Sequence, residues 1–127
     1  MKKLLLIPII ALFTGCVTLD PGADPVAVNA EKTTQVAYDV FNTFVHLEYD
    51  HKSDFAQIGK GPHQIANQIR LHGRDWLKTA RALTNTYEAN RTPENKANLL
   101  TSIAVIQSAM TEAQKYIAQY HTVTRNP

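Results

Sequence analysis

Cysteine and net charge are both scarce in this sequence of 127 residues. A single cysteine, Cys16, excludes an internal disulfide and a cysteine-rich metal site. The 13 Lys and Arg residues nearly balance the 11 Asp and Glu residues, whereas electrostatic binding of nucleic acid needs a basic patch or stripe. We therefore expect no nucleic-acid partner, and a chain of this length has room for one compact domain.

Motifs that would support catalysis or cofactor binding are also missing. No serine lies in a Gly-x-Ser-x-Gly context, and no Cys-x-x-Cys-His segment is present to attach haem. The turn-like segment Gly59-Lys60-Gly61 lacks the Lys-Ser/Thr pair that follows in a phosphate-binding loop. The sequence therefore predicts a protein that is not an enzyme and that has no cofactor.

The N-terminus has the order of a secretory signal. Two lysines precede a ten-residue apolar run from Leu4 to Phe13, and small Gly15 then stands directly before Cys16. A helix needs about 20 apolar residues to cross a bilayer, so this run is too short to span one. We expect residues 1–15 to be a signal peptide that is cleaved between Gly15 and Cys16.

The residues around this cleavage point define the kind of signal. Phe13-Thr14-Gly15-Cys16 resembles the lipobox of bacterial lipoproteins, although Phe13 stands where leucine is usual. The resemblance implies a diacylglycerol linked to Cys16 by a thioether. Val17, in place of aspartate, implies the outer membrane at its periplasmic face, or the plasma membrane in a Gram-positive host. The alternative is an ordinary secretory signal cut near Gly15 or Gly22.

A short tether is expected after the cysteine, over residues 16–24. The chain from Val17 to Pro25 reads VTLDPGADP, and its two Asp-Pro steps disfavour an early helix. Asp24-Pro25 is typical of a helix start, with aspartate as the N-cap and proline at the first helical position. Thr92-Pro93 predicts a second such start.

Three long amphipathic segments follow, at about residues 25–58, 62–89 and 93–121, and residues 122–127 are expected to be a flexible tail. Helices of this length joined by tight turns bury their apolar stripes by lying antiparallel. The sequence therefore predicts an all-α, up-down-up three-helix bundle, with a break near residues 50–54 left open. The apolar stripes recur at steps of three and four: Val26, Ala30, Thr33, Ala37, Val40, Phe44 and Leu47; Ile65, Ile69, His72, Trp76, Ala80, Leu83 and Tyr87; Leu99, Ile103, Ile106, Met110, Ala113, Ile117 and Tyr120.

Histidines give the only candidates for a small-molecule site. His72 stands beside Trp76 in an apolar stripe, which indicates a buried histidine with a polar partner or, alternatively, a ligand contact. Glu48 and His51 have the spacing that di-iron bundles use, but such sites need a second pair and further carboxylates. We therefore expect a solvated or interfacial polar cluster there and no metal site.

Val45 and Val105 lie off the centres of their stripes, where they are candidate contacts for a partner helix or a second copy. The sequence thus favours a membrane-anchored, non-catalytic interaction or structural module of the cell envelope. Envelope spacers, assembly accessories and phage-encoded lipoproteins of lysis or exclusion belong to this class. The alternative is a small-ligand or metal-binding bundle that uses His72 with Trp76, or Glu48 with His51.

Overall fold

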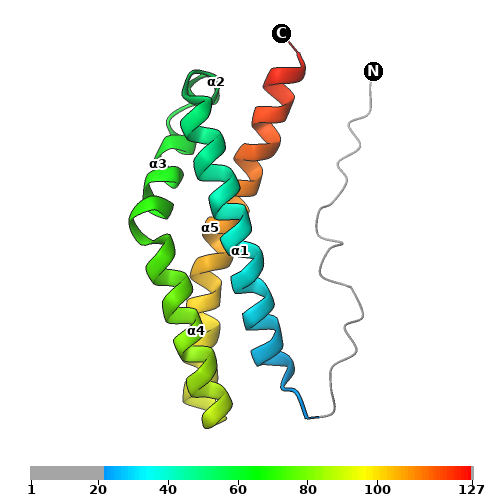
Figure 1. Ribbon diagram of the computed structural model, residues 1–127, viewed down its shortest axis with the longest axis vertical. Coiled ribbons are helices and arrows are strands. Elements are labelled where there is room, and N and C mark those ends of the chain that lie inside the picture. The colour runs from blue at the N-terminus through cyan, green and yellow to red at the C-terminus, as the bar shows by residue number, and fades with distance from the viewer. Residues whose placement is uncertain (1–21, 127) are drawn as a thin grey trace.

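The computed structural model describes residues 22–126, which are helical almost throughout and contain no strand (Figure 1). The expected signal peptide, Cys16 and most of the tether lie outside the described residues. The elements are the α-helices α1 (Pro25–Asp50), α2 (Lys52–Ile58), α3 (Gly61–Gln68), α4 (Arg74–Ala89) and α5 (Pro93–Arg125), with a π-helical turn, η2 (Ile69–Gly73), between α3 and α4.

The long elements lie side by side. In Figure 1 the chain rises through α1, turns at α2, descends through α3 and α4, and rises again through α5. α1, α4 and α5 each contact the other two, and α2 and α3 cover the upper part of α5. The start of α1 and the turn between α4 and α5 therefore lie at one end of the molecule, and α2 lies at the other.

Capping residues set the starts of two long helices, as the sequence predicts. The Asp24 carboxylate accepts hydrogen bonds from the backbone N–H groups of Val26 (2.8 Å) and Ala27 (3.3 Å), and Thr92 accepts one from Asn95 (3.1 Å). Asp24 also accepts a hydrogen bond from the Tyr87 hydroxyl at 3.0 Å. This hydrogen bond links the beginning of α1 to the end of α4.

The structure decides one boundary that the sequence left open and corrects another. The first helix is broken near residues 50–54, because α1 ends at Asp50 and α2 begins at Lys52. The last helix does not end at residue 121 but continues to Arg125. The hydroxyls of Thr122 and Thr124 bond to carbonyl groups one turn earlier in this added stretch, and Tyr120 at its base stacks on Phe55 of α2.

The core confirms one predicted stripe closely and shifts another. Every buried residue of α5 belongs to the predicted set, in which only Ile117 is partly exposed. On α1 the buried face is displaced by about one position, so that Val40 and Leu47 lie at its margin. Small side chains occupy much of this face and allow close packing with α4 and α5. The buried α1 residues are Ala27, Ala30, Thr33, Thr34, Ala37, Phe41, Phe44 and Glu48.

The buried face of the second long segment departs from the predicted stripe at several positions. Ile69, Ala80 and Tyr87 are buried as predicted, on both sides of the π-helical turn. Gly73 and Leu77 are buried next to the predicted positions, while His72 is exposed and Trp76 is half-buried. The expectation that His72 lies within the apolar stripe is therefore wrong.

Candidate functional site

A buried carboxylate is the most unusual polar feature of the described chain. The Glu48 side chain on α1 is only 2% exposed, whereas an ionised side chain is almost never fully buried without a partner. Glu48 follows Phe41 and Phe44 on the buried face of α1, at the next position of the same spacing. Of the two alternatives, a solvated or an interfacial cluster, Glu48 is therefore interfacial and not solvated.

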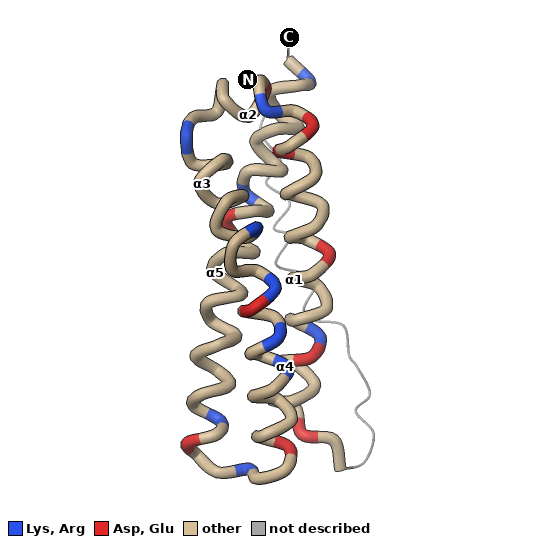
Figure 2. The backbone as a smooth tube through the Cα atoms, turned by 60° about the vertical axis from the view of Figure 1, so that its left-hand side comes forward, with Lys and Arg blue, Asp and Glu red and all other residues tan. Residues whose placement is uncertain are grey.

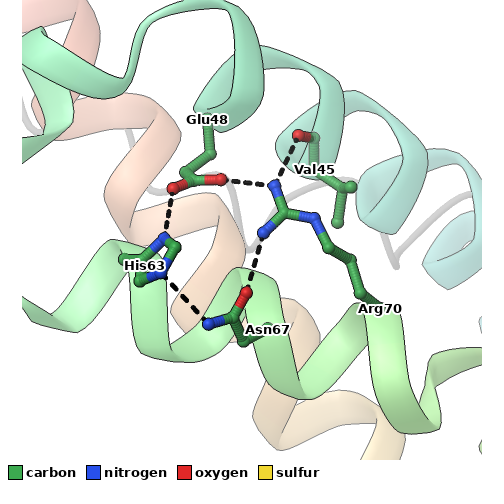
Figure 3. A network of polar contacts seen from close by, with 5 residues as sticks. All are labelled: Val45, Glu48, His63, Asn67 and Arg70. Carbon is green, nitrogen blue, oxygen red and sulfur yellow. Dashed lines mark hydrogen bonds and ion pairs between the residues drawn. The ribbon is translucent and has the colours of Figure 1, made fainter.

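Three residues from the facing segment surround this carboxylate (Figure 3). His63 donates from Nδ1 to one Glu48 oxygen at 2.8 Å, and the Arg70 guanidinium donates to the other oxygen. Asn67 connects the two partners, because its amide nitrogen lies 3.1 Å from His63 Nε2 and its oxygen accepts from Arg70 at 2.9 Å. We call Glu48, His63, Asn67 and Arg70 the carboxylate network.

The spacing of the three partners explains how one segment supplies them. His63 and Asn67 lie on α3, four residues apart, and Arg70 follows three residues later in η2. Steps of four and three place all three side chains on one helical face. Arg70 also donates to the backbone carbonyl of Val45 at 3.4 Å, so the network ties α3 and η2 to the upper half of α1.

Electrostatics keep Glu48 ionised. Burial works to raise the pKa of Glu48, but the hydrogen bonds from His63 and Arg70 and the attraction of the Arg70 charge outweigh it, so the pKa lies below its ordinary value. The amide of Asn67 donates to His63 Nε2, which leaves the ring proton on Nδ1, facing Glu48. Because both of its oxygens accept hydrogen bonds, the Glu48 carboxylate links α1 to α3 and η2.

His51 does not take part in this network. Its ring lies 3.6 Å from the Asp54 carboxylate and packs against Tyr120, with ring centroids 5.2 Å apart. Within residues 22–126, no three His, Cys, Asp or Glu side chains are grouped so that they could hold a metal ion. The pair Glu48 and His51 is thus not brought together as a site.

The other residues singled out by the sequence have different surroundings. His72 lies at the surface with its ring 5.9 Å from that of Trp76. Val45 is half-buried against the core, whereas Val105 is 44% exposed. Trp76 and Val105, from separate segments, meet in one groove between α4 and α5. Its remaining lining residues are Thr79, Leu83, Asn98, Thr101 and Ser102.

Sequence reasoning missed the carboxylate network, although part of the signal is present. Ala37, Phe41, Phe44 and Glu48 follow steps of four, three and four, which places the acid on the buried face. A buried acid calls for a cationic partner. Which cation faces it depends on how the second segment packs against α1, and local spacing does not show this.

Comparison with known proteins gave no match, whether with family models, curated proteins or solved structures. None of the helices in residues 22–126 has the length and apolar character needed to cross a membrane.

Proposed function

We propose that this chain is a bacterial lipoprotein, anchored through lipid on Cys16, and that it acts as a non-catalytic interaction or structural module of the cell envelope. The observation that carries the proposal is the position of the sole cysteine, directly after Gly15 and the apolar run that Lys2 and Lys3 precede. Two or more acyl chains make an anchor stable, since each buried CH₂ contributes about 0.8 kcal/mol. Val17 after the cysteine favours the outer membrane at its periplasmic face.

The arrangement of the helices is compatible with this role. We propose that α1, the α3–η2–α4 run and α5 act as the three legs of an up-down-up bundle. A tether of residues 16–24 reaches at most about 30 Å when fully extended. The end of the molecule that holds Asp24 and the α4–α5 turn would then face the membrane, and α2 would point away from it (Figure 1).

The groove that contains Trp76 and Val105 is the surface we propose for a protein partner or a second copy. Its lining carries no charged residue, and depletion of charge with an aromatic residue at the centre is typical of interface cores. Leu83 adds a half-buried apolar contact, and serine, threonine and asparagine form a polar rim.

The anchor is tested by replacing Cys16 with serine. We expect the wild-type mass in the membrane fraction to equal residues 16–127 plus diacylglyceryl and acyl groups, and we expect Cys16→Ser to abolish this species. Intact-mass spectrometry of membrane and soluble fractions measures both. An unlipidated wild-type chain cut elsewhere would contradict the anchor and leave a secreted helical protein.

The partner surface is tested by introducing a charge at Val105. We expect Val105→Glu to reduce crosslinking to the partner at least tenfold, because association would bury an unpaired carboxylate. Leu100→Glu is the matched control, since Leu100 is 48% exposed on the same helix and does not line the groove. Equal crosslinking yields for the two variants, quantified by mass spectrometry, would assign the contact to another surface.

A further inference from the structure

A second groove, between α1 and the η2–α4 run, combines an apolar floor with basic side chains. Its volume is about 510 Å³, which is within the range of small-molecule sites, roughly 300–1,000 Å³. Phe41 of α1 and Ile69 and Leu77 of the opposite segment are apolar lining residues, and Tyr38, 49% exposed, also lines the groove. The remaining lining residues are Gly73, Arg74, Lys78 and Arg81.

The three cations of this groove are arranged in a row. Arg74, Lys78 and Arg81 are separated by four and three residues, so they share one face of α4 and extend over about 10 Å of its axis. Figure 2 shows basic positions recurring along α4. None of the three forms an ion pair with another residue of the described chain. No acidic residue lines the groove, although Glu31 lines an adjacent hollow together with Arg81.

The π-helical turn gives the floor its shape. Gly73 ends this turn, and a Cβ atom there would lie 3.2 Å from Cγ2 of Ile69 and 3.5 Å from Cδ2 of Phe41. The missing side chain therefore avoids crowding against Ile69 within the turn, and Phe41 of α1 packs beside it at ordinary contact distance. Single π turns inside α-helices are frequent at functional sites, which is an observation independent of the charges.

We propose that this groove binds a monomeric amphiphile with one anionic head group and one apolar chain. The head group pairs with Arg74, Lys78 and Arg81. The chain lies against Tyr38, which is 49% exposed, above the nearly buried floor of Phe41, Ile69 and Leu77. A second copy of this chain fits poorly, because the two rows of like charge would repel. A bilayer presents anionic head groups at its surface, but its acyl chains lie inside the membrane. It therefore does not place an acyl chain over the apolar floor of the groove.

The probe is octyl phosphate, used below its micellar concentration. It is titrated calorimetrically into the full chain. If the protein carries lipid, the protein is held in phosphatidylcholine nanodiscs. Octanol and inorganic phosphate supply the chain and the head group separately. We expect octyl phosphate to bind at one site, and we expect octanol and inorganic phosphate each to bind at least tenfold more weakly. Inorganic phosphate binding as tightly as octyl phosphate would overturn the proposal, because the apolar floor would then contribute nothing.

A charge-matched pair of variants locates the site. The groove variant Arg74→Gln/Lys78→Gln/Arg81→Gln should weaken octyl phosphate binding at least tenfold. The control Lys32→Gln/Lys96→Gln/Arg125→Gln removes three exposed cations outside the groove and should bind like the wild type. Equal loss in both variants would overturn the proposal, as would binding to phosphatidylglycerol vesicles without binding of octyl phosphate. Binding of octyl phosphate does not depend on lipidation of Cys16. The proposed ligand groove and the proposed lipid anchor are therefore tested independently of each other.

Discussion

Replacing Phe44 by alanine is expected to lower the free energy of unfolding by about 3–5 kcal/mol, the usual cost of truncating a buried phenylalanine. The Phe44 side chain is completely buried. Its ring meets Phe55 of α2 edge-on at 6.0 Å and stacks on Tyr116 of α5 at 6.3 Å. The truncation would therefore leave a cavity where three helices meet.

The expected loss of free energy is large in comparison with the total stability of small domains, which is about 5–15 kcal/mol. A loss of this size corresponds to a fall in Tm of roughly 15 °C or more, measured by circular dichroism on the full chain. Tyr49→Ala is the control, because that aromatic side chain on the same helix is 65% exposed. We expect it to change stability by less than about 0.5 kcal/mol, and equal losses for both variants would contradict the assigned core.

Replacing Glu48 by alanine is expected to cost about 2–3 kcal/mol at pH 7, below the roughly 3–5 kcal/mol measured for breaking fully buried pairs. The reduction arises because water reaches both partners: the side chain of Arg70 is 30% exposed and that of His63 is 60% exposed. Urea unfolding of the full chain measures the loss. Glu112→Gln is the control, since Glu112 forms a partly exposed pair with Lys115 at 3.6 Å and should contribute less than about 1 kcal/mol.

The carboxylate network also predicts a pH dependence. The pKa of Glu48 is lowered in the folded state, so its contribution is fully present above the unfolded value, about 4.3, and is lost as the pH falls through the folded value. The wild type should therefore lose more stability than Glu48→Gln between pH 6 and pH 3. Parallel stability curves for the two proteins over this range would show that the network contributes nothing.

Local signals in the sequence were sufficient for several parts of the fold. Asp24-Pro25 and Thr92-Pro93 define helix starts because their capping groups act within three residues. The stripe on α5 is regular and made of large apolar residues, so its buried face follows from helical periodicity. The helical class of the described residues follows from the same periodicity.

The buried faces of the other long segments were harder to predict. On α1 the predicted stripe included Val40 and Leu47, whereas the structure buries the adjacent Phe41 and Glu48. On the second segment periodicity placed His72 inside, whereas the structure leaves His72 at the surface and packs its neighbour Gly73 near Phe41.

The sequence by itself determined the helical class, the capped starts of α1 and α5 and the core face of α5, because each depends on residues a few positions apart. The proposal of a lipid anchor at Cys16 rests on the sequence alone, because Cys16 lies outside the described residues. Only the tertiary structure decided that Glu48 pairs with His63 and Arg70, and that Trp76 meets Val105 in one groove. These contacts join residues 15 to 29 positions apart, and their formation depends on how the helices rotate and pack against one another.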